Sequence, residues 1–441
     1  MSSACSQAVR LPEIVAAILE HLDDKKALFA ALQVNRLWSD EATTLLWLVD
    51  PPHWAFSNIK DAERLQYYAK KISSLGMNFF DHDWKEFGAL GPLWFPRLTK
   101  ISTETYKYAD EQTLLQYLQP SLQTLKSFRG PISEELLLHL QTRCPALQEL
   151  LLSGPWGSTI SFDLLRYLKK MPSLTRIHLD VGLEDVMFEE LCFHLASREN
   201  LLSLILWDSS FTQDQTIKIC AAIADPYRKL TNLSCFSEGR AFKVLSRHLC
   251  NLKSLRLRLV DAFDNVLFAI SSCINLAKID VWFKKGSNVP AEGLLSIAKK
   301  CPHLRVLNLY QTKGITVDGR STTNGRSITD DIIKQVATLL PAITEFRIGI
   351  EADLSVTALQ YLGDLCTRLT TIFLTGIFDL EHLSRTTSAP LFPHLSYIKL
   401  EKVSENFSLE ETIFILRQQA PQLRKFKGSG GQRWCLMLEK E

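Results

Sequence analysis

Apolar residues recur along most of the chain in short blocks of the form L-x-x-L/I-x-L, whose last two apolar positions alternate with a polar one. Such alternation predicts a β-strand with one buried face. Clear blocks begin at Leu122, Leu147, Leu174, Leu201, Leu230, Leu252, Leu276, Leu304, Leu369, Leu395 and Leu423, Ile343 begins one more, and weaker ones begin at Ile72 and Leu98. The chain is therefore built largely from one recurring unit.

Each unit combines a helix with a strand. In residues 291–310, apolar residues at helical spacing lead to Pro302, and the residue before a proline avoids the helical conformation. Leu307 and Leu309 then alternate as strand residues that face a core. One unit cannot cover its own apolar face, so neighbouring units must stack to bury it.

The spacing of the blocks identifies the repeat. The 325 residues from Leu98 to Leu423 make 12 steps of about 27, within the 20–29 residues of a leucine-rich repeat. The predicted fold class is therefore α/β, with a right-handed leucine-rich-repeat horseshoe of about 13 units over residues 97–428. Its parallel strands are expected on the concave side and its helices on the convex side.

Cysteines occupy a repeated position in this register. Cys144, Cys273, Cys301 and Cys366 each lie three residues before the first leucine of a unit, which predicts small buried thiols rather than metal ligands or nucleophiles. With the letters I-T-D at residues 328–330, the array is similar to the cysteine-containing leucine-rich-repeat family, in a divergent form.

Residues 9–48 have a different pattern, which predicts three short helices. Pro12 suits a first helical turn, and the apolar residues after it have amphipathic spacing. Asp23 and Asp24 suit a turn and helix cap, and Asn35 a second break, with the third helix ending near Trp47. So small a unit buries little by itself, so some of its apolar surface is expected to contact a partner or the rest of the chain.

The letters LPEIVAAILEHL, followed by VNRLW, EAT and LLW, resemble an F-box of the fungal type over residues 11–47. Glu13 directly follows Pro12, where many members have one more residue. The resemblance implies docking on the Skp-type adaptor of an SCF (cullin–RING) ubiquitin ligase, to which the remaining chain would bring a target protein. The implied adaptor-binding residues are Leu11, Pro12, Ile14, Ile18, Leu19, Leu22, Val34 and Trp38.

Three further segments have compositions of their own. Residues 49–96 are rich in aromatic side chains and are expected to form a packed junction with a possible first repeat. Residues 311–326 are rich in Gly, Ser, Thr and Asn, which predicts a surface loop, either a contact loop or a tolerated insertion. Residues 429–441 are expected to be a C-terminal tail, entered through a loop at residues 428–431.

The variable positions of each strand predict the chemistry of the concave face, which mixes basic and aromatic side chains of the types enriched in binding hot spots. The predicted target-binding residues are Arg176, Trp207, Arg256, Arg258, Lys278, Trp282, Arg305, Tyr310 and Arg347. Further inner-face positions are His178, Asp280, Asn308, Phe373, Tyr397 and Lys399. Such a surface suits an acidic or phosphorylated protein segment.

Composition removes several classes of function. The net charge of +2 makes nucleic acid an unlikely ligand. No signal peptide or apolar run of 18 residues is present, which predicts a cytoplasmic or nuclear protein without a membrane span. No nucleotide-binding, metalloprotease or serine-hydrolase motif occurs, so we expect no enzyme activity, cofactor or metal. The alternative to the ligase subunit is a leucine-rich-repeat scaffold whose N-terminal helices only cap it.

Overall fold

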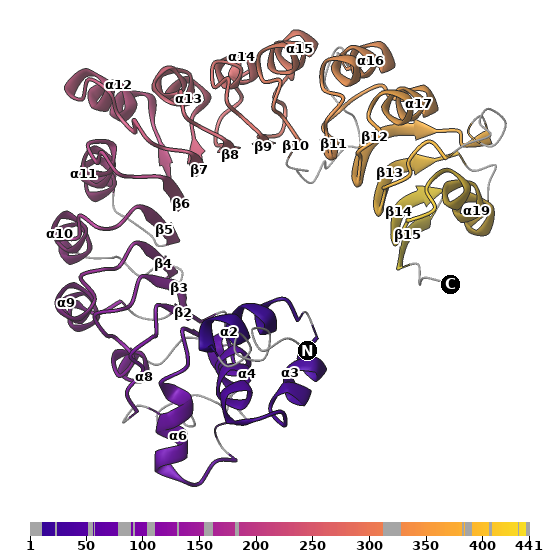
Figure 1. Cartoon of the computed structure of the whole chain (residues 1–441). Helices are drawn as coiled ribbons and strands as arrows, with labels where there is room; N and C mark the ends of the chain where they lie inside the picture. The colour runs from indigo at the N-terminus through magenta and orange to yellow at the C-terminus, as the bar shows by residue number, and fades with distance from the viewer. Residues whose placement is uncertain are drawn as a thin grey trace. The chain divides into compact units, whose positions relative to one another are not determined.

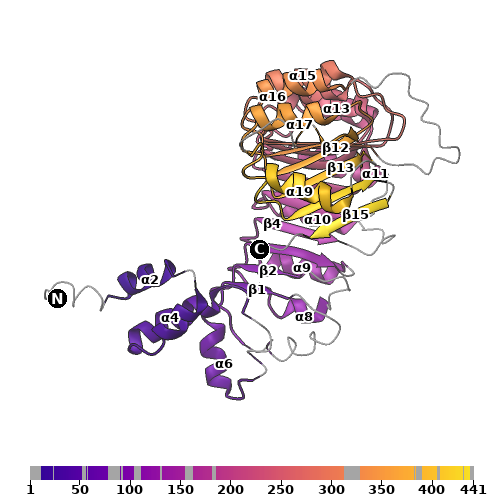
Figure 2. The same cartoon turned by 90° about the vertical axis from the view of Figure 1, so that its right-hand side faces the viewer.

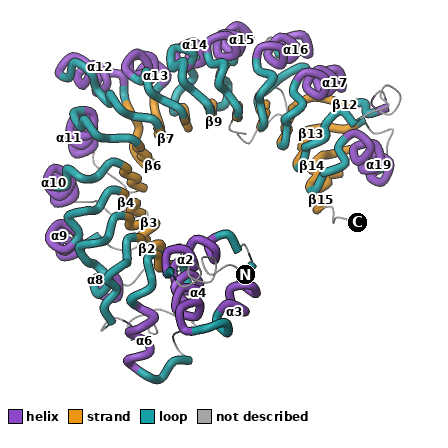
Figure 3. Tube along the Cα trace, in the orientation of Figure 1, coloured by secondary structure: helices purple, strands orange, loops and turns teal. Residues whose placement is uncertain are grey.

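A computed structural model of the chain describes residues 11–22, 24–51, 56, 58–77, 90, 93–103, 111–129, 132–153, 162–180, 185–311, 328–381, 383, 390–404, 408–430 and 432–437. The chain divides into two compact units, Met1–Phe188 and Glu189–Glu441. In both units helices and strands alternate along the chain (Figure 3). The loop predicted at 311–326 lies outside the described residues apart from Gln311, as do Trp54 and the aromatic residues between 79 and 87.

The first unit begins with helices and continues as a sheet. Its helices are α2 (Pro12–Glu20), α3 (Lys25–Ala31), α4 (Arg36–Leu48), α6 (Ala62–Ala69), α8 (Glu111–Leu115), α9 (Glu134–Arg143) and α10 (Phe162–Lys170). Its parallel strands are β1 (Ser74–Gly76), β2 (Lys100–Ser102), β3 (Thr124–Arg129), β4 (Glu149–Ser153) and β5 (Arg176–Asp180), paired in chain order. Helices α2 and α4 lie beyond the β1 edge of this sheet (Figure 2).

The second unit carries the longer run of repeats. Its strands are β6 (Ser203–Phe211), β7 (Asn232–Ser237), β8 (Ser254–Leu259), β9 (Lys278–Phe283), β10 (Val306–Gln311), β11 (Glu345–Gly349), β12 (Thr371–Phe378), β13 (Tyr397–Val403), β14 (Lys425–Gly430) and β15 (Gln432–Met437). Strands β6–β14 pair in parallel with their neighbours in chain order. Within this unit the strands line the inner side of a curve and the helices its outer side (Figure 1).

The helices of the second run follow the same alternation. They are α11 (Asp185–Ala196), α12 (Gln213–Ala222), α13 (Gly239–Leu245), the 3₁₀ helix η1 (Ser246–His248), α14 (Val266–Ile270), α15 (Ala291–Lys300), α16 (Asp330–Leu339), α17 (Val356–Leu365) and α19 (Leu409–Gln419). The α/β leucine-rich-repeat fold predicted from the block spacing is confirmed, with N-terminal helices followed by parallel strands that alternate with helices.

The predicted apolar registers form the cores. Leu304, Leu307 and Leu309 are all fully buried, and the first leucine of each clear block is buried as well. The backbone locks one repeat to the next: the residue before a strand and the first strand residue both donate their N–H groups to one carbonyl of the preceding repeat, as Thr344 and Glu345 do to Arg305. The Thr344 hydroxyl donates to the same carbonyl, at 3.0 Å.

The cysteine prediction is confirmed. Cys144, Cys273, Cys301 and Cys366 are buried, and their thiols are free. Burial raises the pKa of Cys273 and of Cys366 to about 12, so these thiols stay protonated at neutral pH. The Cys273 and Cys301 thiols donate to carbonyls of the preceding repeat, which makes them packing residues between repeats.

The predicted loop and tail at the C-terminal side are wrong over most of their length. Strand β14 continues to Gly430, and residues 432–437 form β15, which pairs antiparallel to it. The ring of Trp434 lies 6.2 Å from that of Phe426, so this strand is held by apolar packing as well as by hydrogen bonds. At Gly428 a side chain would meet the Phe426 ring at 2.7 Å, so this glycine gives the phenylalanine its space.

Substitution of one core leucine tests the register. We expect Leu307→Ala to lower the free energy of unfolding by about 2–5 kcal/mol, because it leaves a cavity in a fully packed site. Arg305→Ala, two residues away and exposed, should leave stability within about 0.5 kcal/mol of the parent. Thermal unfolding of both variants measures the difference, and equal shifts would contradict the register.

Candidate functional site

The three N-terminal helices share a small core of their own. Val15, Leu19, Leu28, Ala31 and Ala42 are its buried residues. The predicted cap at Asp24 is present, because Asp24 accepts a hydrogen bond from the Lys26 N–H. Asn35, predicted only as a break, caps α4 by accepting from the Trp38 N–H.

One apolar face of α2 is left outside this core. Leu11, Ile14 and Ile18 follow each other at helical spacing and are 51%, 36% and 39% exposed. Phe29 on α3 and Val34 in the following turn are each 58% exposed. Single exposed apolar residues are ordinary, but five in so short a segment exceed what its own core can bury.

This arrangement corrects part of the predicted adaptor-binding set. Leu19 is fully buried, and Leu22 and Trp38 are half-buried against the same core. The reason is helical geometry: Val15 and Leu19 lie four residues apart on the inward face, whereas Leu11, Ile14 and Ile18 lie on the other. Sequence reasoning merged the two faces into one stripe and overlooked Phe29.

A charged network joins α4 to α6. The Lys71 ammonium, whose side chain is 10% exposed, lies 2.7 Å from an Asp40 carboxylate oxygen and also donates to the Thr44 hydroxyl at 2.8 Å. The Tyr67 hydroxyl donates to the same Asp40 oxygen. Hydrogen bonds from Lys71 and Tyr67 hold the pKa of Asp40 below its usual value of 3.8, whereas burial and the Asp40 hydrogen bond raise the pKa of Tyr67.

The end of α4 runs directly into the sheet. Trp47 stacks on Tyr68 with ring centroids 4.2 Å apart and meets Phe56 edge-on at 5.2 Å. Val49 then forms a parallel bridge with Ser74 of β1, and the Asp50 N–H donates to the Ser74 carbonyl. Among the described residues, Trp47, Phe56 and Tyr68 thus pack together, and the residues directly after α4 pair with the β1 edge.

A second candidate site lies on the concave face of the second unit. Alternate residues of each strand face the same side, so side chains about 27 residues apart in sequence become neighbours in register. Arg256, Asp280, Asn308 and Arg347 lie in one such row, and Arg258, Trp282 and Tyr310 in the next.

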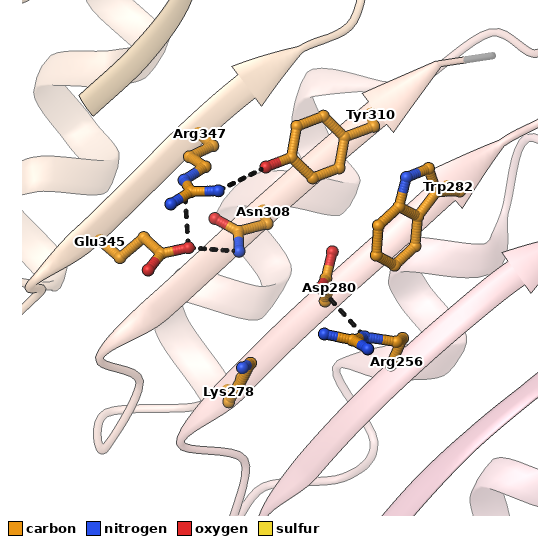
Figure 4. Close-up of a pocket in the computed structure, with 8 residues that line it drawn as sticks. All are labelled: Arg256, Lys278, Asp280, Trp282, Asn308, Tyr310, Glu345 and Arg347. Carbon is orange, nitrogen blue, oxygen red and sulfur yellow. Dashed lines mark hydrogen bonds and ion pairs between the residues drawn. The ribbon is translucent and has the colours of Figure 1, made fainter. Parts of the chain in front are cut away.

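These rows enclose an open pocket of about 410 Å³ (Figure 4). It is lined by Arg256, Lys278, Asp280, Trp282, Asn308, Tyr310, Glu345 and Arg347. Asp280 and Asn308 form its floor and are 4% and 3% exposed.

The cations and carboxylates of the pocket are largely paired. The Arg256 Nε donates to an Asp280 oxygen at 3.3 Å, and the Arg347 Nε lies 3.1 Å from Glu345 Oε1. Asn308 donates to the same Glu345 oxygen at 2.6 Å. Burial raises the pKa of Asp280, and the charges of Arg256 and Lys278 oppose that shift.

Aromatic rings and cations continue on either side of the pocket. Trp282 and Tyr310 stack at 5.4 Å, and Tyr310 lies 6.2 Å from Phe373 across β11. This last contact depends on Gly349, where a side chain would meet the Phe373 ring at 2.7 Å and the Tyr310 ring at 2.9 Å. Beyond them Lys399 lies 4.0 Å from the Phe373 ring centre, and Arg258 lies 5.2 Å from that of Phe236, which also contacts Trp207.

The structure sorts the predicted target-binding residues. It brings Arg256, Lys278, Trp282, Tyr310 and Arg347 into one pocket. Arg258 lies on β8, the strand that carries Arg256, and Trp207 lies on β6, two strands away. Arg176 is exposed on β5 of the first unit.

Arg305 does not belong to this set. It precedes β10, in which Val306, Asn308 and Tyr310 face the pocket side. Because alternate residues face opposite sides, Arg305 is not in line with these three. Glu345 was missed, although its position in the L-x-x-L-x-L block is the one that Lys278 occupies in β9.

Two other kinds of site are not seen in the described part of the chain. None of its helices combines the length and apolar character needed to cross a membrane. No three of its His, Cys, Asp or Glu side chains are grouped so as to hold a metal ion.

Comparison with known proteins finds matches of low similarity among solved structures. No protein-family model and no curated protein sequence matches the chain. Among solved structures, the crystal structure of the Rad7 and Elc1 complex in yeast includes a chain with 15% identity and a TM-score of 0.43, covering 88% of this chain and 87% of that one. The leucine-rich repeat-containing protein LegL7 from Legionella pneumophila has 14% identity and a TM-score of 0.30, covering 78% of this chain and 97% of that one.

The class of the protein follows from its own repeat geometry. Parallel strands in chain order, helices between most successive strands and a buried leucine register in every clear block define a leucine-rich-repeat fold.

The Asp40 network predicts a pH-dependent contribution to stability. Because the folded pKa of Asp40 lies below its unfolded value, the contribution is complete well above pH 3.8 and is lost as the pH falls below that value, through the folded pKa. Asp40→Asn should therefore lower the melting temperature at pH 7, and the difference from the parent should shrink toward pH 3. Glu41→Gln, on the same helix but outside the network, is the control, and a pH-independent difference for Asp40→Asn would contradict the assignment.

Proposed function

We propose that this protein is the substrate-recognition subunit of an SCF-type (cullin–RING) ubiquitin ligase. In this role the N-terminal helices dock on a Skp-type adaptor and the repeats bind a target protein. The chain supplies no chemistry itself. It raises the rate of ubiquitin transfer by holding the target beside the catalytic subunits, which turns a bimolecular encounter into a local one.

The observation that carries the proposal is the unpartnered face of α2. Leu11, Ile14 and Ile18 are exposed while the inward face of the same helix is fully used by the helical core. The sequence resemblance to an F-box places adaptor contacts on these same residues and on Val34. A fold that needed only a cap would have no use for this second apolar face.

Capping and docking involve different parts of the segment. Val49, directly after α4, pairs with the β1 edge, while Trp47 packs α4 on Tyr68 of α6 and Lys71, just after α6, pairs with Asp40 of α4. Helix α2 packs on α4 and takes no part in the sheet. The N-terminal segment is therefore anchored to the repeats through the end of α4, while α2 presents the docking face.

A double substitution on the exposed face tests the docking role. Leu11→Ala with Ile18→Ala should weaken binding of a purified Skp-type adaptor by about 2–3 kcal/mol, or roughly 30–150-fold, because each side chain loses apolar area that the adaptor would cover. Isothermal titration calorimetry measures the affinity, and circular dichroism should show an unchanged melting temperature.

Two controls separate this proposal from the cap-only scaffold. Ile274→Ala removes a 54% exposed apolar side chain from the second unit and should leave adaptor binding unchanged. Trp47→Ala removes the stack on Tyr68 and should lower stability by about 2 kcal/mol. If the parent chain binds no Skp-type adaptor while Trp47→Ala still destabilises it, the helices are a cap and the ligase role is wrong.

A further inference from the structure

The pocket floor carries hydrogen-bond acceptors that the chain itself leaves unused. Asp280 binds Arg256 through one carboxylate oxygen, and its other oxygen, Oδ1, is buried without a hydrogen-bond partner. Asn308 donates its amide to Glu345, and its carbonyl oxygen is likewise buried and unpartnered. Both residues are more than nine-tenths buried. A guest at this floor must therefore supply N–H or O–H donors.

The charge of the pocket limits what the donor can be. Its cations are Arg256, Lys278 and Arg347, and its carboxylates are Asp280 and Glu345, which leaves one positive charge in excess. An ammonium or guanidinium guest would meet like charges on three sides. A neutral carboxamide has no charge to be repelled. Its two N–H groups can donate to the free oxygens of Asp280 and Asn308, and its carbonyl oxygen can accept from Lys278.

The rings around the pocket indicate how the rest of a ligand lies. Trp282 and Tyr310 stand on adjacent strands and stack with an interplanar angle of 25°, so their faces are turned toward each other. Arg256 lies 5.7 Å from the Trp282 ring centre, and Phe373 approaches Tyr310 from the opposite side. Rings whose faces are occupied in this way offer their positively polarised edges to a ligand, which favours carboxylate oxygens over stacked nucleobases.

The charges of the wider face agree with an acidic ligand. Between β8 and β14 the concave positions hold seven cations and three carboxylates: Arg256, Arg258, Lys278, Arg347, Lys399, Lys425 and Lys427 against Asp280, Glu345 and Glu401. Seven strands at about 4.8 Å spacing span about 29 Å, the length of roughly nine residues of extended chain.

We propose that the concave face of the second unit binds an extended acidic peptide segment that crosses strands β8–β14, anchored by an Asn or Gln side chain between Asp280 and Asn308. The peptide binding itself does not depend on the proposed function. The inference rests on the proposed function only in treating a protein that carries such a segment as the ligase target.

Selection from a random dodecapeptide phage library on the immobilised full-length chain, without any adaptor, tests the specificity. The expected result is enrichment of Asp and Glu with Asn or Gln at one fixed position. Enrichment of Lys or Arg, of another residue at the anchor position, or of no sequence at all would overturn the proposal. Because the selection contains no adaptor, a negative selection would not contradict adaptor docking. Equally, a chain that binds no adaptor could still select acidic peptides.

Variants then locate the selected peptide by fluorescence anisotropy. Asn308→Leu should abolish the preference for Gln over Leu at the anchor position, a readout that general loss of folding would not produce selectively. Lys399→Glu should weaken binding at least tenfold at low salt, whereas Lys299→Glu on the outer helix α15 makes the same charge change and should alter it less than twofold. Equal effects of the two charge changes, or equally tight binding of a twelve-residue oligothymidylate, would sink the assignment.

Discussion

The constraint on which this structure depends is that no repeat can bury its own leucines. Leu304, Leu307 and Leu309 are fully buried because the repeats on either side cover them, and the first leucine of each other clear block is buried as well. The backbone reinforces this dependence, since one carbonyl of each repeat accepts two N–H groups from the next. Stability and shape are thus properties of pairs of repeats, and the N-terminal helices and β15 matter because they stand where a neighbouring repeat is missing.

The same constraint creates the concave face. Once every second strand residue is committed to the core, the residues between them have one side left, and the parallel register sets them in rows. Asp280 and Asn308 are buried by their neighbours in these rows and not by the leucine core. The residues of the concave face can therefore differ in chemistry without loss of the fold. The buried polar atoms of Asp280 and Asn308 lie where such residues form a pocket.

The sequence predicts the repeated parts well and the special parts less well. Local pattern was sufficient for the strands of the repeats, the buried cysteines and the break before α4, because each depends on residues close in sequence, whereas β15 was expected to be a tail. Leu19 was assigned to the wrong face because two apolar faces of one short helix look like a single wide stripe. Arg305 was placed on the concave side because the L-x-x-L-x-L pattern does not show where the strand begins. The pocket was not foreseen because its lining residues come from four strands, β8–β11, that only the register brings together.

Strand β15 has a consequence for how such an array can grow. A further repeat pairs its strand in parallel with the one before it and reaches that position through a helix, as β7–β12 and β14 do. Residues 432–437 instead turn back antiparallel along β14 and take up its hydrogen-bonding edge. Tandem duplication of a unit can therefore lengthen this protein only upstream of Lys425, and the reversed strand acts as a stop that also shields β14 from pairing with an edge strand of another molecule.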